Sequence, residues 1–184
     1  MDKSSRIIFY DLETTGLDCN TDQIIEIAGK DNTGNIFSKL INPKKEINKK
    51  IEEITGISNN NIKYRNTIEQ NRKKIEEWFD FNNKDNYLIA HNGDNFDLKF
   101  ISKVFNISCK SIDSLKFFKK LVRQHSYSIK NLCELFNINT KGHHRALNDV
   151  LILEKLFNKG IELYKVKYNL DYVSIKEIYD FTYS

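Results

Sequence analysis

The sequence contains one proline, Pro43, and three cysteines, Cys19, Cys109 and Cys133. An odd number of scattered cysteines without a C-x-x-C pair provides neither a disulfide framework nor a zinc site, and indicates free thiols in a reducing compartment. No apolar run approaches the roughly 18 residues of a membrane span, and the run at 7–10 is too short for a signal peptide. We therefore expect a soluble, intracellular protein, cytoplasmic or nuclear depending on its source, with no membrane partner.

The 184 residues are 40% hydrophobic and 29% charged, which excludes a disordered or collagen-like chain and is enough for an ordinary core. At about 150 residues per domain, the length predicts one domain. The formal net charge of +4 tolerates a polyanionic partner but does not identify one. Most cations are lysine, and the chain is rich in asparagine and isoleucine. We interpret this bias first as the codon usage of an AT-rich genome, and only second as a sign of nucleic-acid binding.

Short β-branched and aromatic runs predict strands, and apolar residues at helical spacing predict helices. The predicted strands are residues 7–10, 23–28, 36–41, 87–90 and 112–114, the first three forming an antiparallel meander. The predicted helices are residues 47–54, 68–79, 96–105, 115–122, 129–136 and 146–164, the last interrupted at Gly160. Strands first, followed by helices interleaved with two more strands, predict an α/β domain with a mixed sheet.

Asp11 and Glu13 end the first predicted strand, and residues two apart on a strand face the same side. Two carboxylates held side by side repel each other unless a cation neutralises them, and their hard oxygens suit Mg²⁺ or Mn²⁺. A solvated strand end would show the same spacing. The turn that follows, Thr14, Thr15 and Gly16, favours the metal site, because a small turn lets a phosphate ester approach closely.

Further candidate residues lie where helices are predicted to begin. Asp97 follows the fourth predicted strand, at a helix N-terminus that can form the wall of a site. Asp94 competes as the functional acid, but its position just after Gly93 fits a helix cap. His144 and Asp149 are five residues apart, about 500° around a helix, so they cannot share a helical face. We therefore expect His144 on a loop, where a mobile general base can act, and Asp149 on the helix below it.

These segments resemble the DEDDh 3′→5′ exonucleases of the RNase H-like superfamily. The resemblance is carried by residues 9–17 (FYDLETTGL), 90–97 (AHNGDNFD) and 144–149 (HRALND), and extends over about residues 6–160. The chain is similar to three-prime repair exonucleases, although it lacks their proline-rich insertion, to the epsilon proofreading subunit of DNA polymerase III and to RNase T. The family implies an α/β, RNase H-like fold with a mixed five-stranded sheet flanked by helices.

The resemblance implies that four carboxylates hold two divalent cations, Mg²⁺ or Mn²⁺: Asp11, Glu13, Asp97 and Asp149. One cation is expected on Asp11, Glu13 and Asp149, where it activates water, and the other on Asp11 and Asp97, where it steadies the leaving 3′-oxygen. His144 is the implied general base. His143 is the alternative, and the four residues between histidine and aspartate in the family motif decide for His144.

The same carry-over implies substrate contacts at Thr14, Leu17, His91, Asn92 and Phe96. Thr14 would meet the terminal 3′-hydroxyl, Leu17 would pack against the last bases, and Phe96 would pack against a base or sugar. A histidine in the position of His91 is more often a hydrogen-bonding residue at a strand end. Such apolar contacts tolerate any base, so we expect little sequence preference.

The implied activity is two-metal hydrolysis of single-stranded DNA from its 3′ end, releasing 5′-mononucleotides. Alternatives are a 3′→5′ exoribonuclease, since nothing in the sequence reports on a 2′-hydroxyl, and a proofreading subunit that mainly binds a polymerase through a tyrosine-rich tail. We expect an exonuclease domain at 1–165 and a C-terminal extension at 166–184 docked on it. The strand at 36–41 can also be an exposed edge that pairs two copies into a homodimer.

Overall fold

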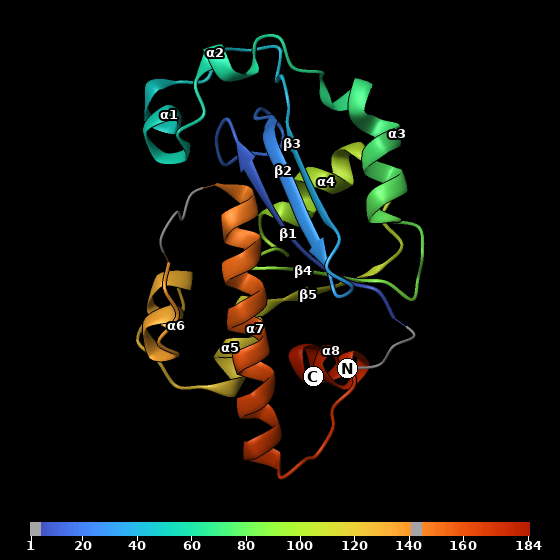
Figure 1. Ribbon diagram of the computed structural model, residues 1–184, viewed down its shortest axis with the longest axis vertical. Coiled ribbons are helices and arrows are strands. Elements are labelled where there is room, and N and C mark those ends of the chain that lie inside the picture. The colour runs from blue at the N-terminus through green and yellow to red at the C-terminus, as the bar shows by residue number, and fades with distance from the viewer. Residues whose placement is uncertain (1–4, 141–144) are drawn as a thin grey trace.

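The computed structural model describes residues 5–140 and 145–184. Its five strands are β1 (Ile7–Thr14), β2 (Ile24–Asp31), β3 (Ile36–Leu40), β4 (Tyr87–Ala90) and β5 (Lys110–Asp113). They form one sheet in the order β3-β2-β1-β4-β5, shown in Figure 1. The pairs β1–β2 and β2–β3 are antiparallel, whereas β1–β4 and β4–β5 are parallel. The predicted α/β fold with a mixed five-stranded sheet is confirmed.

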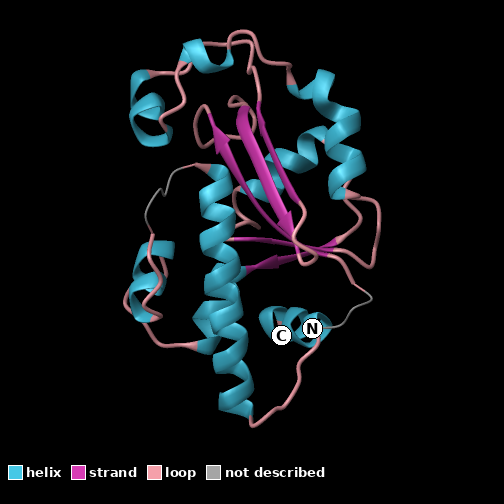
Figure 2. Ribbon diagram, viewed as in Figure 1, coloured by secondary structure: helices cyan, strands magenta, loops and turns pink. Residues whose placement is uncertain are grey.

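Helices lie on both faces of this sheet (Figure 2). In chain order they are α1 (Lys49–Thr55), α2 (Asn59–Ile62), α3 (Ile68–Phe79), α4 (Asp97–Val104), α5 (Ser114–Leu121), α6 (Ile129–Leu135), α7 (Ala146–Tyr168) and α8 (Ile175–Tyr183). Three of them begin with capping boxes, in which the N-cap side chain and the third helical residue bond each other's backbone. In the described part of the chain, no helix combines the length and apolar character needed to cross a membrane.

The alternation of β1 divides the core between the two faces of the sheet. Ile7 and Phe9 pack in the same cluster as α7, whereas Ile8 and Tyr10 pack with α3 and α4. The ring of Phe9 lies edge-on to that of Phe157 in α7, with centroids 5.8 Å apart. Burying one such aromatic side chain is worth about 1.5–3 kcal/mol. This packing fixes α7 against the strand that carries the first two candidate acids.

The final long helix differs from its predicted extent. α7 passes through Gly160 without a break and continues beyond the predicted end near residue 164 to Tyr168. A Cβ atom on Gly160 would lie 2.6 Å from the ring of Phe117 and 2.9 Å from that of Phe118. The glycine is therefore required for close packing of α7 on α5, and the energy of that packing outweighs the low helix propensity of glycine.

The last residues of the chain form α8, which packs on the same core. Val173, Ile175 and Ile178 are each at most 3% exposed and belong to the cluster that contains the buried face of α7. α7 itself runs uninterrupted through residues 165 and 166. The division into an exonuclease domain at 1–165 and an extension at 166–184 stays a prediction.

Candidate active site

Three carboxylates meet where α7 begins beside the end of β1. Asp11 and Glu13 come from β1 and Asp149 from the first turn of α7, and each offers an oxygen that lies within 4.8 Å of those of the other two. Asp11 and Glu13 share a face with Phe9, the side of β1 that α7 covers. The hydrophobic contact between β1 and α7 therefore also brings Asp149 to the two strand acids.

Asp97 lies beside this trio, as the first residue of α4. Asp97 is 3% exposed, and its carboxylate accepts a hydrogen bond of 3.2 Å from the backbone N–H of Leu12, which lies between the two acids of β1. Burial raises the pKa of Asp97 to about 8, and the charges of Asp113 and Glu13 also raise it, while backbone hydrogen bonds act in the opposite direction. Asp97 is thus fixed to the strand that carries Asp11 without being among the three closest ligands.

The carboxylates disturb one another's ionisation. Burial, followed by the charges of Asp97 and Asp149, raises the pKa of Asp11 well above its usual range. Like charges gathered in a site of low dielectric resist joint ionisation, and a cation between them removes that cost. Hard oxygen donors in close array suit Mg²⁺ or Mn²⁺. The residues present therefore fit a divalent metal, as expected from the sequence.

The cap predicted for α4 is wrong. The N-cap of α4 is Phe96, whose side chain makes no capping hydrogen bond. Asp94 instead forms an ion pair of 2.6 Å with Lys116 of α5 and accepts a hydrogen bond of 2.9 Å from the hydroxyl of Tyr183. A helix cap is a local interaction, and here two partners from distant parts of the chain replace it.

An ion pair between a buried carboxylate and a half-exposed arginine holds the beginning of α7, and we call it the β2 support. Glu26 of β2 is 1% exposed and lies directly opposite Glu13 in the sheet. Its two oxygens accept from Arg145, at 3.2 and 2.9 Å, and one of them also accepts from the backbone N–H of Ala146 at 3.1 Å. Two parallel N–H···O bonds to one carboxylate fix geometry as well as charge. The support positions the helix that carries Asp149.

A second set of hydrogen bonds holds residues 91–94 from the opposite side, and we call it the β5 support. It consists of Asp113, Ser114 and Tyr183. The backbone N–H of Asn92 donates to Asp113 at 2.8 Å. The hydroxyl of Tyr183 accepts from the backbone N–H of Asp113 and donates to Asp94. The segment that precedes Asp97 is therefore tied to β5, α5 and α8.

His91 is held within this support. Its Nδ1 lies 2.8 Å from the Ser114 hydroxyl, and its Nε2 lies 2.8 Å from the carbonyl oxygen of Tyr127. Burial lowers the pKa of His91 to about 4, so the ring is neutral at pH 7. Both ring nitrogens already have protein partners, which is the structural arrangement typical of a histidine at a strand end. Its assignment as a substrate contact stays a prediction.

The other predicted substrate residues lie on two segments near the carboxylates. Thr14 is buried at the end of β1 and its hydroxyl donates to the carbonyl of Gly16, whereas Leu17 is 85% exposed. A Cβ on Gly16 would lie 2.4 Å from the carboxylate of Asp22, so a larger residue in this turn would require that side chain to move. Asn92 has a left-handed φ of 61°, and asparagine adopts that conformation more readily than most residues.

Phe96 packs its ring against Phe100 with centroids 5.1 Å apart. The predicted general base, His144, and its alternative, His143, lie outside the described residues, which resume at Arg145, the N-cap of α7. The roles assigned from the sequence to Phe96, Thr14, Leu17 and His144 stay predictions.

Sequence reasoning missed the residues of both supports. Glu26 interrupts an otherwise apolar stretch at 24–28, and a charged residue inside a central strand is a signal that could have been followed. Tyr183 gave no such signal, because its partners Asp94 and Asp113 are 89 and 70 positions away.

Comparison with known proteins agrees with this geometry. The family described as "Exonuclease" matches residues 8–157. The chain is 34% identical over 191 residues to a PolC-type DNA polymerase III of Thermotoga maritima, covering 92% of the chain but 14% of that protein. It is 32% identical over 183 residues to the DNA polymerase III subunit epsilon of Aquifex aeolicus, covering 93% of the chain and 88% of the subunit.

Two solved structures share the fold. Exonuclease X, in complex with a duplex DNA that has 5′ overhangs, superposes with a TM-score of 0.72 at 22% identity and covers 96% of this chain and 99% of its own. Exonuclease I gives a TM-score of 0.74 at 15% identity, covering 97% of this chain and 43% of its own. The RNase H-like fold is thus confirmed by structure and the family by sequence: the chain belongs to the exonuclease family, among its DEDDh-type 3′→5′ exonucleases.

Proposed function

We propose that the protein is a metal-dependent 3′→5′ exonuclease that removes 5′-mononucleotides from single-stranded DNA with two divalent cations. The observation that carries the proposal is the convergence of Asp11, Glu13 and Asp149, whose oxygens lie within 4.8 Å of one another. Asp97 adds a fourth carboxylate, which is bonded to the backbone N–H of Leu12 between Asp11 and Glu13. Two neighbouring cation sites can clamp both the attacking and the leaving oxygen of an in-line displacement at phosphorus.

The residues of the chain take distinct roles in this reaction. Asp11, Glu13 and Asp149 would hold one cation, and Asp11 with Asp97 would hold the second. Bound there, the cations would supply activation of the attacking water and neutralisation of the charge on the leaving 3′-oxygen. His144 accepts the proton of the attacking water, a contribution of typically about 10²–10⁴-fold.

The terminal nucleotide is oriented by contacts that do not read its base. The backbone of Thr14 meets the 3′-hydroxyl, and the exposed side chain of Leu17 packs against the last bases. Apolar packing of this kind tolerates any unpaired base. DNA is favoured over RNA because the relatives named above are DNA polymerase III proteins.

The test is hydrolysis of a 5′-labelled oligodeoxynucleotide with Mg²⁺, with and without EDTA. We expect a ladder that shortens from the 3′ end in wild type, and none with EDTA or in Asp149→Ala or His144→Ala. Asp171→Ala is the matched control, because it removes an exposed aspartate far along the chain. A ladder that persists in EDTA would refute the metal mechanism, and faster cleavage of a matched RNA would refute the DNA assignment.

We also propose that the protein works beside a DNA polymerase, with residues 166–184 as an extension that contributes the contact surface. The end of α7 exposes Val166 (79%) and, just beyond it, Leu170 (37%). Truncating this segment would remove the buried side chains of Ile175 and Ile178, so point variants are the better test. Val166→Asp with Leu170→Asp should abolish pull-down of the replicative polymerase of the source organism. An unchanged pull-down would exclude this surface.

A further inference from the structure

An exposed aromatic residue stands on a rigid ridge away from the carboxylates. The ridge consists of Lys63, Tyr64 and Arg65, between α2 and α3, and Tyr64 is 86% exposed. The Nζ of Lys63 lies 4.9 Å from the centre of the tyrosine ring. A tyrosine left almost wholly in water contributes little to the stability of the fold, and both faces of its ring are largely open to a ligand.

Hydrogen bonds to Asn42 hold the backbone of this ridge. The side-chain amide of Asn42 donates to the carbonyl of Lys63 at 2.9 Å, and its backbone N–H donates to the carbonyl of Asn66 at 3.1 Å. The N–H of Arg65 also donates to the carbonyl of Ile62 at 2.8 Å. The exposure of Tyr64 is therefore a feature of a fixed backbone, which presents the ring at little conformational cost.

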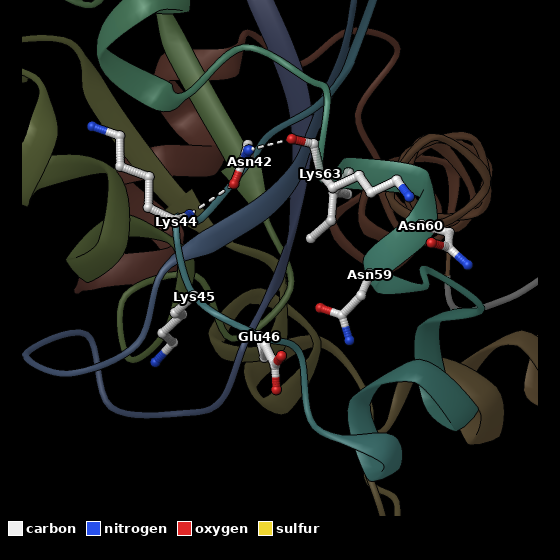
Figure 3. Close-up of a pocket in the computed structure, with 8 residues that line it drawn as sticks. Asn42, Lys44, Lys45, Glu46, Asn59, Asn60 and Lys63 are labelled. Atoms are coloured by element: carbon white, nitrogen blue, oxygen red, sulfur yellow. Dashed lines mark hydrogen bonds between the residues drawn. The ribbon is translucent and has the colours of Figure 1, made fainter.

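A basic hollow lies on each side of the ridge. The first, of about 410 Å³, is bordered by Lys44, Lys45 and Lys63, which Figure 3 shows around the pocket with Asn42 between Lys44 and Lys63. The second, of about 490 Å³, is lined by four cations, namely Lys39, Arg65, Lys74 and Arg145. The ridge thus divides one basic surface into two concave parts.

The second hollow keeps an excess of positive charge. Glu26 is the one acidic residue among those that line it, and Arg145 neutralises it. Across residues 5–140 and 145–184, no carboxylate pairs with Lys39, Arg65 or Lys74. In the first hollow, Lys45 pairs with Asp22 and Lys44 lies 3.8 Å from Glu69. The unpaired charge is therefore concentrated in the hollow next to the β2 support.

The register of the sheet connects this hollow with the carboxylates. Glu13 lies opposite Glu26, and Glu26 lies opposite Leu40, which lines the hollow. Directly opposed residues project to the same face, and neighbouring strands are about 4.8 Å apart. One row across β1, β2 and β3 therefore leads from a metal-binding acid into the basic hollow within two strand spacings.

We propose that the ridge and its two hollows bind the single-stranded part of the substrate, 5′ of the nucleotide being removed. Tyr64 stacks on an unpaired base, and Lys39, Arg65 and Lys74 pair with phosphates. A basic groove with an aromatic platform is the arrangement by which proteins hold single strands without reading sequence. This inference rests on the proposed exonuclease function and extends the substrate site beyond the terminal nucleotide.

The test is fluorescence anisotropy of a labelled oligothymidylate with the protein in EDTA, where hydrolysis is prevented. We expect Tyr64→Ala to bind about tenfold more weakly, and Tyr64→Phe, which keeps the ring, to bind as wild type does. In Arg65→Ala with Lys74→Ala, the slope of log affinity against log salt should fall by about 1.4, because each phosphate contact on a single strand contributes about 0.7.

Lys155→Ala with Lys159→Ala removes the same charge from α7 and is the control for non-specific attraction. Equal binding by wild type and Tyr64→Ala, or equal slopes for the two double variants, would overturn the proposal. A change of oligomeric state in Tyr64→Ala at unchanged affinity would assign the ridge to a protein partner instead. Hydrolysis of a dinucleotide by the wild type with Mg²⁺ tests the exonuclease function separately, because that measurement does not alter the ridge.

Discussion

The carboxylate cluster is held from two sides by supports of different chemistry. The β2 support is a charge pair, in which the half-exposed Arg145 neutralises the buried Glu26 opposite Glu13. The β5 support works through hydrogen bonds, with the neutral ring of His91 fixed by both nitrogens. In the β2 support, Arg145 compensates the charge of a buried acid that lies opposite Glu13. In the β5 support, hydrogen bonds fix the geometry of His91 and Asn92, and Lys116 of α5 neutralises Asp94. The following experiments disturb the cluster and then each support, in order of decreasing effect.

Replacing one of the three clustered carboxylates should reduce the hydrolysis rate more than any change in a support. Asp149→Asn keeps the shape of the side chain but removes its charge from the trio. We expect the hydrolysis rate at saturating Mg²⁺ to fall by at least about 10²-fold, since charge stabilisation at the reacting phosphate is lost. The melting temperature should not fall, because repulsion with Asp11 is relieved. A rate within a factor of a few of wild type would contradict the placement of Asp149 in the site.

Breaking the β2 support should cost less activity. Glu26→Gln loses the ion pair that fixes the start of α7, and changes to residues that orient metal ligands typically cost about 10–100-fold. We expect kcat to fall and the Mg²⁺ concentration for half-maximal rate to rise, with little change in the KM for a dinucleotide. Equal loss of kcat at every Mg²⁺ concentration would indicate a structural role only.

A double-mutant cycle measures the interaction energy between Glu26 and Arg145. Arg145→Met leaves the buried carboxylate of Glu26 without a counter-charge, and removing one partner of a buried pair costs up to about 3–5 kcal/mol. Because Arg145 is half-exposed, we expect a smaller loss in the free energy of unfolding. Glu26→Gln with Arg145→Met should be more stable than the sum of the single changes predicts. Simple additivity would show that the two residues act independently.

The contrast between the supports also explains what the sequence could predict. Asp11 and Glu13 follow from the period of a strand, and the apolar periodicity of residues 146–164 placed Asp149 on a helix, because both rules are local. Glu26 contributes through the cross-strand register and an ion pair 119 positions away, which no local rule specifies. The prediction that Asp94 caps α4 was wrong for the same reason, because Asp94 forms its ion pair with Lys116, 22 positions away.

Acid should weaken the β5 support. The pKa of His91 is lowered from 6.5 to about 4 by burial. Between these values the unfolded chain binds more protons than the folded one, so this contribution to stability is complete above pH 6.5 and is lost as the pH falls toward 4. We expect the melting temperature of wild type to drop by on the order of 5 °C more than that of His91→Gln across this window. Parallel pH profiles would show that the ring does not titrate in this way.

The mildest disturbance removes one hydroxyl from the β5 support. Tyr183→Phe loses the bonds to Asp94 and to the N–H of Asp113, while the ring keeps its contact with Tyr179. At about 0.5–1.5 kcal/mol for each of the two bonds, we expect the free energy of unfolding in urea to fall by about 1–3 kcal/mol at an unchanged m-value. Activity should fall less than in Glu26→Gln, because Asn92 remains bonded to Asp113 and α4 keeps its place. If Tyr183→Phe instead slowed hydrolysis as much as Glu26→Gln does, the position of Asp97 would depend on α8, and the two supports would be equal in function despite their different chemistry.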